Sequence, residues 1–233
     1  MLKAFTAFTN EIDNIEQAVS ELLSQLDMED KLLENSIGIV SCYTEYLESG
    51  VIAELSRRLP FDVLGTTTIA NASRGEVGEM MLNLMVLTSD DVSFSTGLTE
   101  PILGESEEPI RAAYESAAAK LSGKADLIIS FAPLLLNVGG DFFINAFDRV
   151  TGGIPNFGAI TVDHNPDYGQ ASVIYNGEAY RDRYAFILAQ GNLSPAFYIG
   201  NISEEKVFSE KGAVTASVGN QLQAVNGVSV TDY

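Results

Sequence analysis

The stretch SIGIVSCYTEYLESGVIAELSRRLPFDVLGTTT, residues 36–68, predicts a strand, a helix and a second strand in that order. Residues 37–43 form a short apolar run of the length typical of a buried strand. Apolar residues between 51 and 59 then recur on one face of a helix, which ends at Pro60 because proline cannot continue it. Residues 61–65 form a second apolar run that enters a turn of three threonines. This order indicates an α/β fold.

The rest of the chain predicts similar elements on both sides of this stretch. A helix over about residues 10–27, capped by Asn10, comes first, because apolar residues recur there at spacings of three and four. We expect helices over 105–121 and 142–150. We expect further strands at 79–87, 92–97, 126–131, 156–161, 171–175, 184–189 and 196–199.

The two halves of the chain share an order of predicted elements and a short motif. Pro60 is followed by Gly65-Thr66-Thr67-Thr68, and Pro155 is followed by Gly158-Ala159-Ile160-Thr161. We therefore predict one domain over residues 1–233, built of two fused half-units at about 36–100 and 125–200. Each half-unit is expected to be a β-α-β-β-β unit, and the mixed sheets are expected to be covered by helices.

The charge of the chain excludes some partners. Its 13 Lys and Arg against 32 Asp and Glu give a net charge of −19, which repels nucleic-acid phosphates and anionic lipid headgroups. We expect no nucleic-acid or membrane partner. The most apolar stretches, 80–87 and 127–136, are much shorter than the roughly 20 residues of a membrane helix, and the N-terminus lacks a targeting pattern. A soluble cytoplasmic protein is predicted.

The single cysteine and the single histidine restrict the chemistry. Cys42 excludes an internal disulfide, and one histidine excludes a His-rich metal site, so we expect no metal and no other cofactor. Cys42 is expected to pack in the core, the alternative being a catalytic thiol that depends on His164. The chain has no Gly-x-Ser-x-Gly motif for a serine hydrolase.

Polar residues follow the second strand of the opening stretch. In open α/β sheets, ligands bind outside the carboxyl ends of strands, so Thr66, Thr67 and Asn71 are candidate ligand-binding residues. Arg74 lies in the same loop, and its planar guanidinium suits a carboxylate. The alternative is a hydrated turn whose arginine is exposed and offset by neighbouring glutamates.

Two further loops contain candidate ligand-binding residues. Asn137, Gly139 and Gly140 follow an apolar strand and open a helix, whose free N–H groups suit a small anion. The alternative is a tight turn, and the lack of a Gly-Lys-Ser/Thr ending argues against a nucleotide. His164 lies in a polar loop with Asp163 and Asp167, as a ligand-contacting imidazole or a base, or simply as a surface histidine in a turn.

Several of these stretches resemble the FIST N-terminal domain family. The similar residues are Ser36-Ile37-Gly38-Ile39-Val40-Ser41, Leu59-Pro60, Asp62-Val63-Leu64-Gly65-Thr66-Thr67, and the segments at 172–178 and 214–227. The resemblance covers about residues 36–233. It departs at Ile69-Ala70-Asn71, where the family often has Gly-Glu.

The resemblance implies a function and a partner. It implies a sensory input domain that binds a small ligand, such as an amino acid or a small carboxylate. It also implies that the signal passes to a C-terminal FIST portion or another output module, and that the chain ends about where that portion would begin. Two alternatives stay open. They are a small-molecule hydrolase or transferase that uses His164, and a protein-interaction scaffold.

Overall fold

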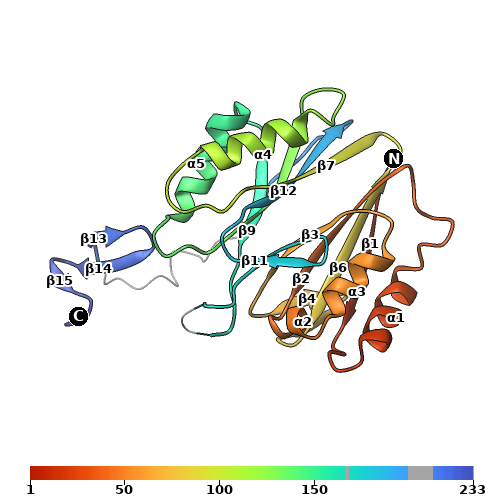
Figure 1. The fold of residues 1–233 in the computed structure, drawn as a ribbon, viewed down its shortest axis with the longest axis horizontal. Coiled ribbons are helices and arrows are strands. Elements are labelled where there is room, and N and C mark those ends of the chain that lie inside the picture. The colour runs from red at the N-terminus through yellow and green to blue at the C-terminus, as the bar shows by residue number, and fades with distance from the viewer. Residues whose placement is uncertain (166–167, 199–211, 233) are drawn as a thin grey trace.

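The body of the molecule consists of two mixed β-sheets that face each other, with helices on the outer side of each (Figure 1). The computed structural model describes residues 1–165, 168–198 and 212–232. The arrangement is an α/β fold, as the sequence predicts.

The first sheet contains, in spatial order, β1 (Leu2–Thr9), β6 (Leu82–Ser89), β2 (Asn35–Cys42), β3 (Val63–Thr67), β10 (Val173–Tyr175) and β11 (Glu178–Tyr180). The second contains β7 (Val92–Leu98), β12 (Ala185–Gly191), β8 (Leu127–Ala132) and β9 (Asn156–Ile160).

Helices cover the outer face of each sheet through their apolar sides. The first sheet is covered by α1 (Ile15–Leu26), α2 (Glu45–Glu48) and α3 (Val51–Arg58), and the second by α4 (Glu108–Ala118) and α5 (Gly140–Thr151). The N-cap of α1 differs from the prediction, because the side chain of Asn14, rather than that of Asn10, accepts the N–H of Gln17 at 3.0 Å.

The apolar core forms three layers. One lies between the first sheet and its helices, and another lies between the second sheet and its helices. The third joins the inner faces of the two sheets and contains the buried residues Ile37, Leu64, Phe131, Val173, Ala185 and Ile187. Because β10 and β11 follow β9 in the chain but extend the first sheet, the two halves are interwoven.

The two sheets share one pattern of strand pairing. The order β1-β6-β2-β3 in the first corresponds to β7-β12-β8-β9 in the second, with two antiparallel pairs followed by one parallel pair in each. The registers place Gly65 opposite Val40 and Gly158 opposite Ser130. The two Gly-x-x-Thr motifs therefore occupy equivalent positions.

The strand pairing does not divide the chain where the sequence suggests. Strand β7, expected at the end of the first half-unit, pairs with β12 in the second sheet, and β1, which the sequence analysis did not predict, is the edge of the first sheet. The shared order of strand pairing begins at β1 in the first sheet and at β7 in the second, and the duplication itself stays a prediction. The superposition of residues 36–100 on 125–200 stays a prediction.

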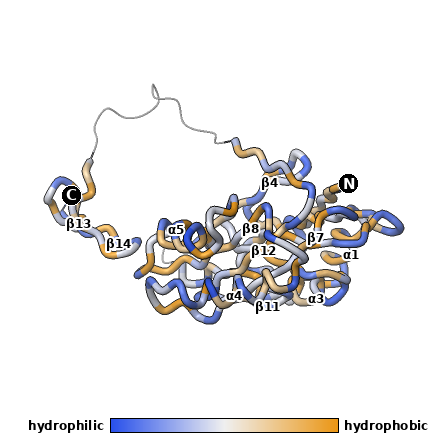
Figure 2. Tube along the Cα trace, turned by 90° about the horizontal axis from the view of Figure 1, so that it is seen from above, coloured by the Kyte–Doolittle hydropathy of each residue, from blue (hydrophilic) through white to orange (hydrophobic). Residues whose placement is uncertain are grey.

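Two smaller sheets lie outside these layers. One is the hairpin of β4 (Asn71–Ser73) and β5 (Glu76–Gly78); the other contains β13 (Val214–Val218), β14 (Gln221–Val225) and β15 (Val228–Ser229). Figure 2 shows β13 and β14 beside the body, near α5. Asn220 anchors this sheet, because its side-chain amide donates to the carbonyls of Leu135 at 2.9 Å and Val138 at 2.8 Å. Of the strand expected at 196–199, residues 196–198 are not in a strand and residue 199 lies outside the described residues.

Candidate functional site

The carboxyl ends of β3 and β9 meet, and this brings Thr66 and Thr67 close to the loop that contains His164. Both threonines are buried. The carbonyl of Thr67 accepts the N–H of Val162 at 3.4 Å, and the hydroxyl of Thr67 accepts the N–H of Ser172 at 2.9 Å. The Thr66 hydroxyl donates to the carbonyl of Thr67. These hydroxyl groups tie the strand ends and loops together.

His164 packs against the residues that follow β2. Its ring stacks on Tyr43 with the centroids 4.6 Å apart, and its Nε2 lies 3.7 Å from the Glu45 carboxylate. The preceding Asp163 is fully buried, and its carboxylate accepts two backbone N–H groups of the loop at 2.6 Å each. Desolvation and the negative charge of Glu45 raise the pKa of the Tyr43 phenol. Neither Tyr43 nor Glu45 is among the ligand-binding residues that the sequence predicts.

A hydrolase or transferase that uses His164 would need a nucleophile close to the imidazole. In the described part of the chain, no hydroxyl or thiol forms a hydrogen bond with the imidazole. Cys42 is buried, and burial raises the pKa of its thiol, so it stays protonated. One oxygen of Glu45 and the hydroxyl of Thr44 are buried without a hydrogen-bond partner among the described residues. This end of the sheet therefore has spare polar atoms but no activated nucleophile among those residues.

Asn71 and Arg74 have side-chain partners of their own and make no hydrogen bond with the two threonines among the described residues. The Asn71 side chain accepts from Ser41 Oγ at 2.6 Å and donates to a main-chain carbonyl, so it holds the β4–β5 hairpin to the sheet. Arg74 is at the tip of that hairpin and its guanidinium lies 3.5 Å from Gln25 Oε1, which also accepts from the backbone of β1. Arg74 therefore contacts the β1 side of the first sheet, whereas the threonines lie on β3, with β6 and β2 between these two strands.

Asn137, Gly139 and Gly140 precede and open α5, beside the second sheet. The Asn137 amide donates to the carbonyl of Leu103, and Gly139 is the N-cap position. Gly140 lines a cavity of about 430 Å³ between α5 and β9. The predicted residues are thus distributed over three places, and their role in ligand binding stays a prediction.

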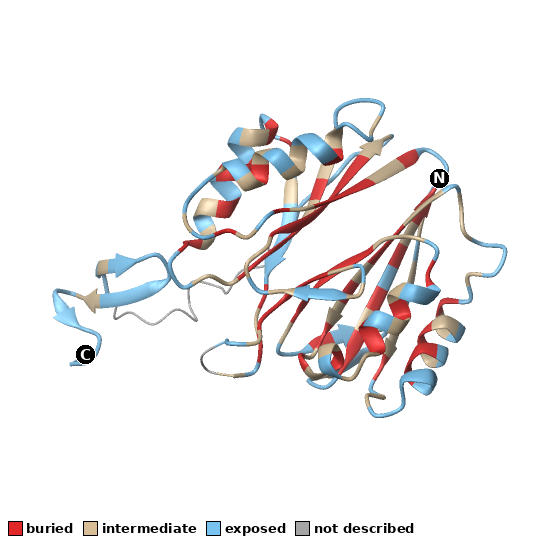
Figure 3. Cartoon of the chain, viewed as in Figure 1, coloured by how far each residue is buried: buried red, intermediate tan, exposed pale blue. Residues whose placement is uncertain are grey.

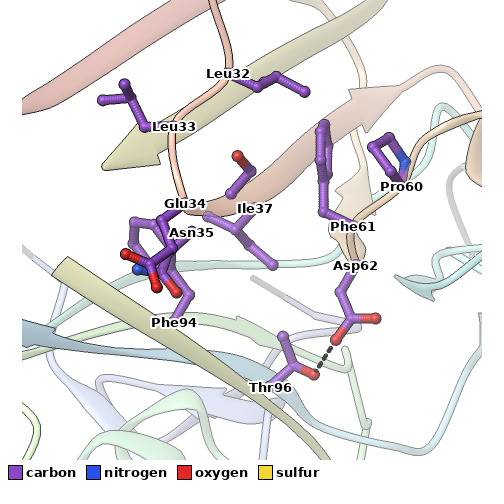
Figure 4. Close-up of a pocket in the computed structure, with 11 residues that line it drawn as sticks. Leu32, Leu33, Glu34, Asn35, Ile37, Pro60, Phe61, Asp62, Phe94 and Thr96 are labelled. Carbon is purple, nitrogen blue, oxygen red and sulfur yellow. Dashed lines mark hydrogen bonds between the residues drawn. The ribbon is translucent and has the colours of Figure 1, made fainter. Parts of the chain in front are cut away.

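A different cavity lies at the opposite ends of β2 and β3, where the two sheets meet (Figure 4). It has a volume of about 420 Å³. Its walls come from the segment before and at the start of β2, from the segment before β3, and from β7 of the second sheet. The lining residues are Leu32, Leu33, Glu34, Asn35, Ser36, Ile37, Pro60, Phe61, Asp62, Phe94 and Thr96. We refer to it as the intersheet pocket.

A hydrogen-bond network borders the intersheet pocket and joins the two sheets. The Thr96 hydroxyl of β7 is 2.6 Å from Asp62 Oδ2 and 2.9 Å from the Tyr175 hydroxyl of β10. The Asn176 amide donates to the other oxygen of Asp62 at 2.9 Å. Burial and the nearby Asp62 carboxylate raise the pKa of the Tyr175 phenol, which keeps it protonated as a donor. Asp62 is therefore fixed at the edge of the pocket.

The charges and rings of the intersheet pocket suit a cation. Glu34 and Asp62 are the charged side chains among the lining residues, and both are acidic. A carboxylate oxygen accepts about two hydrogen bonds, so Asp62 retains capacity for a donor from a ligand. The phenyl rings of Phe61 and Phe94 provide apolar contact and attract cations through their faces. An ammonium group attached to an apolar body meets each of these features.

The intersheet pocket is not predicted from the sequence, because the predicted sites lie at the carboxyl ends of strands and this pocket lies at the amino ends of β2 and β3. The pair Phe61-Asp62 follows the helix-ending Pro60, and it was interpreted only as the start of a strand. A carboxylate at the amino end of a buried strand is a weak local signal, and Phe94 and Thr96 join it only through the packing of the two sheets.

The fold defines the class of protein, an α/β domain of two face-to-face mixed sheets with helices outside. The model of the FIST N domain matches residues 36–228, and the chain belongs to this family. FIST domains are sensory domains of signal transduction. No curated protein matches the sequence.

One of the solved structures that match the chain is the crystal structure of cyanuric acid hydrolase from A. caulinodans. It is 12% identical to this chain, with a TM-score of 0.39, and the match covers 81% of this chain and 70% of that one. In the described ranges, no helix is long and apolar enough to cross a membrane, and no three His, Cys, Asp or Glu side chains gather as a metal site.

Proposed function

We propose that the chain is a cytoplasmic sensory input domain that binds a small organic cation with an apolar body in the intersheet pocket. The observation that carries this proposal is the pairing of Glu34 and Asp62 with the rings of Phe61 and Phe94 in a cavity without a basic side chain. The net charge of −19 attracts cations to the molecule as a whole. A free carboxylate ligand would meet repulsion in the same pocket.

The position of the pocket suits signalling. Its walls belong to both sheets, and the network from Asp62 to Thr96 joins the sheets at its edge. A ligand that contacts both walls favours whichever relative position of the sheets fits it best. The change in position would pass to a C-terminal FIST portion or another output module.

Other functions predicted from the sequence compete with this proposal, among them a protein-interaction scaffold. The sequence favours a small carboxylate held by Arg74 near Thr66, Thr67 and Asn71, or an anion at the start of α5. A hydrolase or transferase that uses His164 is the enzyme alternative. The unpaired oxygen of Glu45, close to His164, is the observation in favour of a polar ligand at that end of the sheet.

A thermal-shift screen followed by calorimetry tests the proposal. The panel contains apolar primary amines, their N-acetylated forms, amino acids and small carboxylates. We expect amines to raise the melting temperature and the acetylated forms to leave it unchanged, because only the charged form pairs with the two carboxylates. Glu34→Gln should weaken amine binding about tenfold, which is about 1.4 kcal/mol.

Matched variants distinguish the sites. Glu115→Gln removes an exposed carboxylate on α4 and should leave amine affinity unchanged. Two outcomes would refute the intersheet pocket as the ligand site. One is carboxylate binding that is lost in Arg74→Ala. The other is binding of any ligand that is lost in His164→Ala but retained in Glu34→Gln. Hydrolysis of an ester or amide that disappears in His164→Ala would favour the enzyme alternative.

A further inference from the structure

The two equivalent strands β3 and β9 differ in what covers them. All five residues of β3 are buried, and its outer edge is paired with β10. Four of the five residues of β9 are exposed, and no strand among the described residues pairs with its outer edge (Figure 3). The contrast is clear at Leu64 and Phe157, which precede the equivalent glycines. Leu64 is fully buried, whereas Phe157 is 64% exposed.

The backbone of β9 presents N–H and C=O groups along its outer edge that could pair with another strand. The N–H of Thr161 donates to Ala132 and the carbonyl of Pro155 accepts from Ile128, so odd-numbered residues face β8. Successive residues alternate, and the N–H and C=O groups of Asn156, Gly158 and Ile160 therefore point to the outer edge. In β3 the same alternation turns Gly65 outward, and that glycine lies opposite Ile174 of β10.

Among the described residues, this edge also lacks the charged side chains and the covering element that keep edge strands apart. Residues 152–162 contain no charged side chain, although the chain as a whole has a net charge of −19. Edge strands are normally protected by charges, bulges or a covering element. Here Phe157 and Ile160 are exposed on the strand, and Ile144 of α5 is exposed beside it. Two copies of the chain can meet along this segment without placing carboxylates opposite each other.

We propose that β9 is the interface with a second copy of this chain, paired with its own β9 in antiparallel orientation about a two-fold axis. Centred on Gly158, the pairing lets the two glycines exchange hydrogen bonds through their outward N–H and C=O groups. Phe157 then lies opposite the small Ala159 of the second copy, and Asn156 lies opposite Ile160. The strand is thus complementary to itself, and the two second sheets become one continuous sheet.

Sedimentation velocity of the 233-residue chain over a wide range of concentration tests this interface. We expect the mass to rise from one copy to two, and Phe157→Lys to raise the dissociation constant at least tenfold by placing two like charges at the edge. The matched control is Val77→Lys on the β4–β5 hairpin, where Val77 is 78% exposed, and it should leave the dissociation constant unchanged. Ile160→Pro, which removes one outward N–H without adding charge, should also weaken the dimer.

Hydrogen exchange of the unmodified chain provides a second measurement that does not depend on a variant. The amides of Gly158 and Ile160 should become more protected as concentration rises, while those of the β4–β5 hairpin should not. Any of three results would overturn the proposal. The chain could stay monomeric at every concentration, the dimer could persist in Phe157→Lys and Ile160→Pro, or hydrogen exchange at β9 could be independent of concentration.

Discussion

At the scale of single residues, two glycines allow the parallel strands of each sheet to approach closely. A Cβ atom at Gly65 would lie 1.7 Å from the carbonyl oxygen of Val40, and one at Gly158 would lie 2.0 Å from that of Ser130. Both contacts are with backbone, which cannot rotate away as a side chain can. The glycine of the Gly-x-x-Thr motif is therefore required for strand packing in both sheets, whatever the role of the loop that follows.

Alanine at Gly65 should strongly destabilise the fold. We expect Gly65→Ala to lower the free energy of unfolding by about 3 kcal/mol or more, because the first sheet must separate β2 from β3 to admit the methyl group. Gly104→Ala is the control, since a Cβ there meets no atom within 4 Å, and it should change stability by less than about 0.5 kcal/mol. Urea denaturation measures both, and equal effects would contradict this explanation.

At the scale of elements, the N-terminus of α1 offers two candidate N-cap residues, and the structure uses one of them. Asn10 and Asn14 both precede the apolar stripe of α1, and each has the side chain of a good N-cap. The structure selects Asn14, whose backbone is extended and whose side chain accepts the N–H of Gln17. The residues between them instead form a turn in which Glu11 accepts two backbone N–H groups.

Removal of each asparagine side chain separates the two capping assignments. Asn14→Ala should cost about 1 kcal/mol of stability because it leaves a helix N–H without its partner. Asn10→Ala should stay within about 0.5 kcal/mol of the unmodified chain. Thermal unfolding followed by circular dichroism measures the stability of both variants. A larger loss of stability in Asn10→Ala would show that Asn10 is the N-cap of α1, as the sequence predicts.

At the scale of the whole molecule, the layer between the sheets makes the two halves one cooperative unit. Leu64 contributes to this layer from the first sheet, and Phe131 and Ile187 contribute from the second. The return of β10 and β11 to the first sheet adds backbone pairing between segments from both halves. Neither sheet can lose its partner without exposing apolar surface.

Unfolding should therefore be a single transition that is sensitive to this layer. Leu64→Ala should cost about 3 kcal/mol, while Phe157→Ala at the equivalent but exposed position should cost less than about 1 kcal/mol in dilute protein. Urea transitions followed by far-ultraviolet circular dichroism and by tyrosine fluorescence should coincide. Two separated transitions would mean that the sheets unfold independently.

The sequence alone determined the features that depend on neighbours along the chain. The strand at 37–43, the helical face at 51–59 and the equivalence of the two Gly-x-x-Thr motifs follow from periodicity and from the restricted geometry of proline and glycine. These features, with the FIST resemblance, were sufficient to predict an α/β fold and the family.

Tertiary structure decided which segments lie together. The pairing of β7 with β12, the separation of Arg74 from Thr66 and the intersheet pocket between Asp62 and Phe94 each depend on contacts between residues far apart in the chain. Local patterns carry no information on such distances, because the face and edge that a strand presents depend on its partners. The exposed β9 illustrates this, since β3 is paired with β10 and fully buried, whereas β9 has no such partner among the described residues and is mostly exposed.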